Sequence, residues 1–192
     1  MSRWSYLALK WRAMGWLVLG RQADAKALFD VMLKRWPDDA YALASRAHHF
    51  VQAGQPAEAL PDSNRLVALQ PDNAQGWFNH GFIHEACGQW ELALAAFSRA
   101  TELSPKLDRA WYGQALVLIR LQRLDEAVAA LKRNTELQPM SPFGWYQLAR
   151  VHVDRQQPDE AVKVIRHLKG FEPKVAAQLE RETGLLVGGS RS

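Results

Sequence analysis

The sequence predicts an all-α solenoid of helix hairpins, and three regularities support that prediction. Prolines recur every 34 residues, at Pro37, Pro71, Pro105, Pro139 and Pro173. Alanine keeps the same step without exception, at Ala25, Ala59, Ala93, Ala127 and Ala161. A third column holds mostly large apolar residues, namely Phe29, Ser63, Phe97, Leu131 and Ile165. Self-similarity at a fixed period of this length is typical of stacked helical repeats.

Two more columns explain why each repeat is expected to be a pair of packed helices. One column is bulky: Leu9, Leu43, Trp77, Trp111 and Trp145. The other is small: Ala13, Ala47, Gly81, Ala115 and Ala149. Two helices approach closely only where side chains are small, and a bulky residue one turn away fills the neighbouring space. The alternation therefore predicts a helix hairpin in every repeat.

These columns resemble the pattern of the tetratricopeptide repeat (TPR) family. The central unit carries Trp77, Gly81, Ala93, Phe97, Ala100 and Pro105, and the next carries Trp111, Ala115, Ala127, Leu131 and Pro139. The resemblance covers about residues 6 to 175 and implies a right-handed superhelix without a sheet. Ser63 replaces an expected large apolar residue, and Asn134 an expected small or apolar one. Both units are expected to pack less tightly.

The elements follow from this register. We expect one solenoid domain over residues 1–187, built of five units and a closing helix: 6–39, 40–73, 74–107, 108–141, 142–175 and 176–183. Turns between paired helices are predicted at 54–56, Gly88, 122–124 and 156–158. Gly184 should end the closing helix, residues 185–187 can fold back on the last unit, and residues 188–192 form a flexible tail, since they have little to bury.

Composition agrees with an ordinary soluble chain. Hydrophobic residues make up 48% and charged residues 23% of the sequence, and the net charge is +4. This charge is too mild to indicate nucleic-acid binding by itself. The only cysteine, Cys87, has no partner within the chain and fits a reducing compartment. The apolar run at 14–20 is too short for a membrane span and lacks a cleavage site, so we expect a cytoplasmic protein.

The sequence offers little chemistry. His80 and His84 have a spacing that can bind a metal, with Glu85 adjacent, but both fall in columns that elsewhere pack between helices. Acidic pairs such as Asp125 and Glu126 stand at helix starts, where they complement the helix dipole. We therefore predict no catalytic residue, no cofactor and no metal, and a protein that is not an enzyme.

The first helices of the units carry the predicted binding surface. The family resemblance implies that they line a concave groove, and aromatic and Arg side chains are the usual anchors of binding energy. The predicted groove consists of Tyr41, Gln75, Phe78, Asn79, Phe82, Arg109, Tyr112, Leu116, Phe143, Tyr146, Gln147 and Arg150. We expect a peptide with a hydrophobic anchor and an acidic group, the acid pairing with Arg109 and Arg150.

The first helix has a second apolar face. Besides its core residues it carries a stripe at alternating steps of three and four: Trp4, Leu7, Trp11, Met14 and Val18. A helix that is apolar on both sides is expected to be covered on both sides. The candidate covers are a second copy of the chain, another protein, the chain's own tail or a membrane surface, and a homodimer is the leading expectation.

The predicted function is a protein-interaction scaffold or adaptor that binds a peptide or a partner segment. The resembled family includes subunits of bacterial assembly machinery, so a bacterial-type assembly or regulatory complex is the expected setting. Two alternatives stay open. Helical repeats can bind single-stranded RNA by stacking bases on aromatic side chains. The first helix, with Trp residues beside Arg3, Lys10 and Arg12, can also serve a peripheral membrane adaptor.

Overall fold

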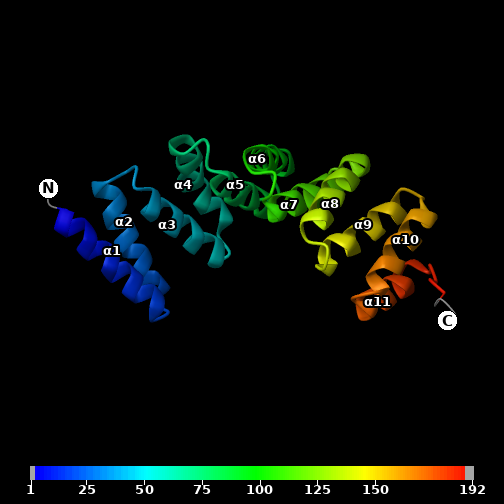
Figure 1. Cartoon of the computed structure of the whole chain (residues 1–192). Helices are drawn as coiled ribbons and strands as arrows, with labels where there is room; N and C mark the ends of the chain where they lie inside the picture. The colour runs from blue at the N-terminus through cyan, green and yellow to red at the C-terminus, as the bar shows by residue number, and fades with distance from the viewer. Residues whose placement is uncertain (1–2, 189–192) are drawn as a thin grey trace. The chain divides into compact units, whose positions relative to one another are not determined.

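The computed structural model describes residues 3–188, and all regular structure within them is helical. The helices are α1 (Arg3–Val18), α2 (Gln22–Arg35), α3 (Ala40–Gln52), α4 (Pro56–Leu69), α5 (Ala74–Ala86), α6 (Trp90–Leu103), α7 (Asp108–Arg120), α8 (Leu124–Leu137), α9 (Pro142–Asp154), α10 (Pro158–Lys169) and α11 (Pro173–Thr183) (Figure 1). The predicted all-α class is confirmed.

The chain divides into two compact units, Met1–Ala96 and Phe97–Ser192, and α6 crosses the boundary. In the first unit α1 packs against α2, α2 against α3, α3 against α4 and α4 against α5. In the second unit consecutive helices pack in the same way from α7 through α11, and α11 also packs against α9. The expectation of one continuous domain stays a prediction.

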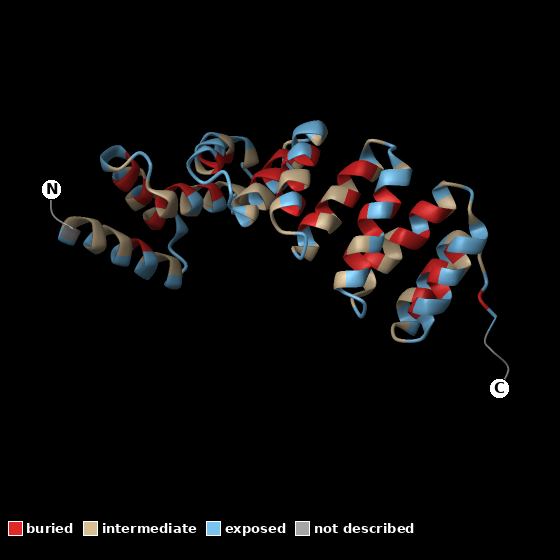
Figure 2. Cartoon of the chain, turned by 45° about the horizontal axis from the view of Figure 1, so that its top comes forward, coloured by how far each residue is buried: buried red, intermediate tan, exposed pale blue. Residues whose placement is uncertain are grey.

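Buried side chains follow the predicted columns. The five alanines of the invariant column are completely buried. In the column of mostly large apolar residues, Phe29, Phe97, Leu131 and Ile165 are buried, and so is the exceptional Ser63. Figure 2 shows these buried stripes along the helices, with exposed residues on the opposite faces. Burial of one apolar stripe per helix is therefore what holds consecutive hairpins together.

The turns inside the hairpins share one backbone conformation. Gly20, Gly54, Gly88, Gln122 and Gln156 all have φ between 57° and 72°, and they stand 34 residues apart. In the turn after α3 the Gly54 N–H donates to the Val51 carbonyl, and the Gln55 N–H donates to the Phe50 carbonyl. This is the hydrogen-bonding pattern that ends many helices at a left-handed residue. The predicted turns are thus in place.

Tryptophan links each of three first helices to the loop before it. The indole N–H groups of Trp77, Trp111 and Trp145 donate to carbonyl oxygens of the phased prolines six residues earlier. The donor–acceptor distances are 2.8 Å to Pro71, 3.0 Å to Pro105 and 2.9 Å to Pro139. The tryptophan and proline columns of the sequence therefore mark the two ends of one hydrogen bond that recurs in these three repeats.

Asn134 is better accommodated than its column suggests. Its Nδ2 donates to the carbonyl oxygen of Asp108 at 2.9 Å, and the residue is buried. A Cβ added at Gly144 would lie 2.2 Å from Asn134 Oδ1. Glycine on α9 thus makes room for this amide, so the expected loose packing is not found at Asn134.

The C-terminal end differs from the prediction at one boundary. Helix α11 begins at Pro173, earlier than the predicted residue 176, because proline suits the first turn of a helix. Gly184, in the left-handed conformation, ends α11 as expected. Val187 folds back and is buried: its N–H donates to Glu180, and its carbonyl accepts from Lys169. Of the predicted tail, residues 189–192 lie outside the described residues.

Candidate functional site

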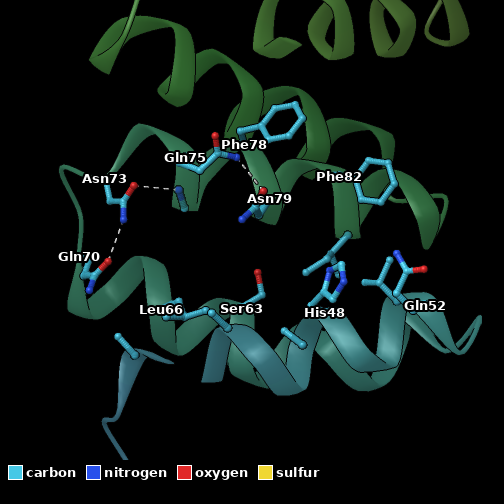
Figure 3. Close-up of a pocket in the computed structure, with 16 residues that line it drawn as sticks. His48, Gln52, Ser63, Leu66, Gln70, Asn73, Gln75, Phe78, Asn79 and Phe82 are labelled. Carbon is cyan, nitrogen blue, oxygen red and sulfur yellow. Dashed lines mark hydrogen bonds between the residues drawn. The ribbon is translucent and has the colours of Figure 1, made fainter. Parts of the chain in front are cut away.

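A pocket of about 390 Å³ opens between α3, α4 and α5 in the first unit (Figure 3). Helix α5 carries four of the predicted groove residues to its lining, namely Gln75, Phe78, Asn79 and Phe82. Helices α3 and α4 form the opposite side, where Leu66 and Ser63 lie. The structure therefore brings these four predicted residues together on one wall of the pocket.

Tyr41, also predicted for the groove, lies elsewhere. Its ring packs edge-on against Phe29 at 5.9 Å between centroids, and the Lys10 ammonium lies 4.4 Å from its ring centroid. Tyr41 belongs to the side chains packed on the core around α1 and α2, and it does not line the pocket.

The pocket exists because small residues meet at one place. On α3 the lining residues include Ala40, Ala44 and Ala47. On α4 the column of Phe29 and Phe97 has the short Ser63 in place of a large residue, and Ser63 lines the pocket and is only 3% exposed. Interiors are close-packed, so a short residue in a column of large ones leaves open space unless a neighbour moves in. Ser63 is thus a cause of the pocket as well as part of its lining.

Amides surround the entrance. Gln75 Nε2 donates to Asn79 Oδ1 at 2.9 Å, and Asn73 accepts from the Gly76 N–H at 3.1 Å and donates to Gln70 at 2.8 Å. Asn73 is also the residue that caps the N-terminus of α5. Side-chain amides can pair with the backbone of an extended peptide because they both donate and accept. The rim is therefore polar and the interior mainly apolar.

A row of hydrogen bonds runs from the pocket into the protein. Ser63 Oγ lies 2.7 Å from His80 Nδ1, His80 Nε2 lies 3.1 Å from His84 Nε2, and His84 Nδ1 lies 2.6 Å from Gln89 Oε1. Both histidines are buried. Burial, and secondarily the neighbouring His84, lowers the pKa of His80 to about 4. The row thus satisfies polar groups that burial would otherwise leave without partners.

The histidine pair has no further ligand around it. Within residues 3–188 no group of three His, Cys, Asp or Glu side chains is arranged to hold a metal ion. Each histidine has a polar partner besides the other ring, Ser63 for His80 and Gln89 for His84. The structure accounts for the pair as packing between helices.

In the second unit the predicted groove residues lie on α7 and α9. Arg109 and Phe143 are exposed, whereas Tyr112, Leu116 and Gln147 are half-buried. The remaining two, Tyr146 and Arg150, contact the closing helix.

Glu182 of α11 contacts both Tyr146 and Arg150. The Tyr146 hydroxyl donates to Glu182 Oε2 at 2.6 Å, and an Arg150 nitrogen lies 3.7 Å from the same oxygen. Hydrogen bonds from Tyr146 and Gln178 lower the pKa of Glu182, and the hydrogen bond with Tyr146 raises the pKa of Arg150. The chain therefore supplies its own carboxylate where the sequence predicted a ligand's acidic group.

Comparison with known proteins identifies the repeat. The family model for the tetratricopeptide repeat matches residues 13–74, 44–108 and 83–142, which together span more than half of the chain. The chain belongs to the TPR family. The structure continues the same helix-pair pattern through α9 and α10, beyond the last matched residue.

Solved structures share the fold at low sequence identity. A MamA structure has 20% identity and a TM-score of 0.78, covering 90% of this chain and 96% of the other. MamA from Desulfovibrio magneticus has 19% identity and a TM-score of 0.78, with coverages of 95% and 98%. YrrB, described as a TPR protein with an unusual peptide-binding site, has 19% identity and a TM-score of 0.78, with 88% of each chain covered. No curated protein matches in sequence.

The apolar stripe of this TPR protein is exposed on α1. Trp4 is 80% exposed, and Trp11, Met14 and Val18 are exposed as well, whereas Leu7 is half-buried. The other side of α1 packs through Ala13, with Leu9 and Trp16 beside it. Among the helices of residues 3–188, none is both long and apolar enough to cross a membrane.

Several lining residues of the pocket were not among the predicted groove residues, and they come chiefly from α3 and α4: Ala44, His48, Gln52, Ser63, Leu66 and Gln70. One signal in the sequence pointed to them. Ser63 interrupts a column of large apolar residues, and a gap in such a column predicts either a defect or a cavity.

Proposed function

We propose that this TPR protein is a non-enzymatic scaffold that binds a segment of another protein along the first helices of its hairpins. The observation that carries the proposal is the pocket bounded by Phe78 and Phe82, with amides at its rim. Concave sites with an apolar interior and a few placed polar groups are the usual form of binding sites. The peptide-binding site described for YrrB is consistent with this use of the fold.

The main contact is proposed for the first unit. Phe82 is 47% exposed at the pocket, so an apolar side chain of a partner removes its ring from water on binding. In the second unit an acidic group of the partner competes with Glu182 for Tyr146 and Arg150. Binding at the first unit therefore displaces no part of the chain, whereas binding of an acidic group at Tyr146 and Arg150 requires Glu182 to leave.

A selection from a random peptide library on the immobilised full chain tests the proposal. Selected peptides should bind with micromolar affinity and lose about tenfold or more with Phe82→Ala, because interface aromatics are common anchors of binding energy. Leu92→Ala is the matched control, since Leu92 is an exposed apolar residue outside the pocket. Equal losses in both variants, or no selected peptide at all, would rule out the proposal.

Salt dependence separates this function from nucleic-acid binding. A peptide held by apolar contacts keeps most of its affinity between about 50 and 200 mM salt, whereas affinity for nucleic acid falls steeply over that range. Binding of a single-stranded oligonucleotide with a steep salt slope, competing with the selected peptides, would replace the scaffold with an RNA-binding function.

The stripe on α1 supports a second proposal, self-association. Several large apolar side chains on one exposed helix face exceed what a soluble surface usually leaves in water. A symmetric dimer buries both copies of the stripe at once, and steps of three and four let two helices lie along each other. The proposed cover is therefore a second copy of the chain.

A further inference from the structure

We infer that the pocket between α3, α4 and α5 takes one aromatic side chain of the partner, of the kind that carries an N–H or O–H group, as tryptophan and tyrosine do. This inference rests on the proposed scaffold function and adds the chemistry that the pocket recognises. It is carried by a comparison between equivalent positions in two repeats and by the direction of the hydrogen bonds beneath the pocket.

The next repeat contains the ring that the pocket lacks. Phe97 follows Ser63 by 34 residues, and Gly113 follows Asn79 by the same step. A Cβ added at Gly113 would lie 2.8 Å from the Phe97 ring, and Phe97 is buried. An aromatic ring on the second helix of that repeat therefore fills the space in front of the first helix of the following repeat.

At the equivalent place in the first unit the ring is missing. Ser63 and Asn79 both line the open pocket, and their side chains are too short to fill it as Phe97 does. The volume of about 390 Å³ exceeds the roughly 150 Å³ of an engineered cavity that accepts benzene. An aromatic side chain from outside thus completes the packing that the chain completes for itself one repeat later.

The polar floor selects among aromatic side chains. Gln89 Oε1 only accepts, so His84 donates to it from Nδ1. Both imidazoles are buried without an opposite charge on their ring nitrogens, which favours neutral rings. His84 Nε2 then accepts from His80 Nε2–H, and His80 Nδ1 accepts from the Ser63 hydroxyl. Ser63 therefore offers only lone pairs to a ligand, and the ligand must donate.

Small model compounds test the pocket directly. N-acetyl-L-tryptophanamide and N-acetyl-L-phenylalaninamide are titrated into the ¹⁵N-labelled full chain, and the amide signals of α3 and α5 are followed. We expect saturable shifts centred on pocket residues such as Asn79 and Phe82. The tryptophan compound should bind about two- to tenfold more tightly, the range that one net hydrogen bond provides.

Three variants separate the space from the hydrogen bond. Ser63→Phe fills the pocket and should abolish binding of both compounds. Ser63→Ala keeps the space but removes the acceptor, so the preference for the tryptophan compound should fall to about one. Ala44→Trp blocks the pocket from an exposed position if Ser63→Phe does not fold. The control is Ala57→Trp, an exposed helix alanine that does not line this pocket.

The outcomes distinguish this inference from the scaffold function. Shifts away from the pocket, or binding that survives both pocket-filling variants, overturn the inference. Equal affinity for the two compounds overturns its donor requirement. If selected peptides lack tryptophan and tyrosine and ignore Ser63→Phe, yet still depend on Phe82, the scaffold stands and the aromatic anchor fails. If no peptide is selected while the compounds bind as expected, the pocket chemistry stands and the scaffold function fails.

Discussion

Ser63 Oγ on α4 lies 2.7 Å from Nδ1 of His80 on α5, so the short residue in the column of Phe29 and Phe97 gives a buried imidazole a hydrogen-bond partner. The pKa of His80 falls from 6.5 to about 4 in the folded protein, chiefly because the ring is buried. The unfolded chain therefore binds a proton between these values that the folded chain does not.

Stability should consequently decrease as the pH falls through this window. The contribution of His80 is fully present above pH 6.5 and is lost progressively down to about pH 4, by at most about 3 kcal/mol. Urea unfolding at pH 7 and pH 5 measures it. His80→Gln should flatten the pH dependence, whereas His48→Gln, at an exposed position, should leave it unchanged. The same slope in all three proteins would show that His80 is not its source.

The Trp111 indole should contribute measurably to stability through its bond to Pro105. Trp111→Phe keeps an aromatic ring but removes the donor, so we expect a loss of about 0.5–1.5 kcal/mol, the net value of one hydrogen bond. Trp90→Phe is the comparison, at the start of α6 and outside the tryptophan column. Chemical denaturation of both variants decides, and a larger loss at Trp90 would contradict the assigned role of the Trp–Pro link.

Gln156→Gly should stabilise the protein. Gln156 has φ of 57°, a conformation that costs a side-chain-bearing residue about 1–2 kcal/mol. Glycine adopts it freely but loses about 0.5–1 kcal/mol through its more flexible unfolded chain. We expect a net gain of about 0.5–1 kcal/mol in thermal or urea unfolding. Gln138→Gly, where φ is −131°, should destabilise instead. A loss at both positions would mean that the turn is not strained.

Gly113→Ala should destabilise the second unit. The added Cβ would approach the Phe97 ring to 2.8 Å, and overpacking of this kind typically costs about 1–3 kcal/mol. Phe97→Leu in the same chain should recover part of the loss, which a double-mutant cycle measures. Gly15→Ala, with nothing near its added Cβ, serves as the helix-propensity control and should be neutral or stabilising. Strict additivity of the two substitutions would exclude the contact.

Substitution of the α1 stripe should convert the proposed dimer to a monomer. Trp4→Glu with Trp11→Glu places charges at two exposed positions, so the fold should be kept while association is lost. Leu7 is a poorer choice because it is half-buried. Analytical ultracentrifugation of the parent protein and the variant, each at tens of micromolar, measures the oligomeric state. A monomeric parent protein that floats with liposomes would assign the stripe to a membrane surface, and a monomer that ignores liposomes would leave it to another protein.

The features that the sequence determined by itself are local. The 34-residue period placed the hairpin turns and the buried alanines because helix formation, chain reversal and helix crossing depend on residues close together in the chain. The predicted start of α11 was three residues too late. The 34-residue register assigned Pro173 to the end of the fifth unit, although proline also suits the first turn of a helix.

The tertiary structure alone decided how the candidate site is divided. A pocket is a space left by several helices together. The short Ser63 side chain leaves a pocket only because Ala44 and Asn79 line the same space. Asn134 is equally irregular in the sequence, yet Gly144 and the Asp108 carbonyl accommodate it. The carboxylate beside Arg150 comes from Glu182 on another helix. Such partners are chosen by packing between distant segments, which a repeat pattern does not encode.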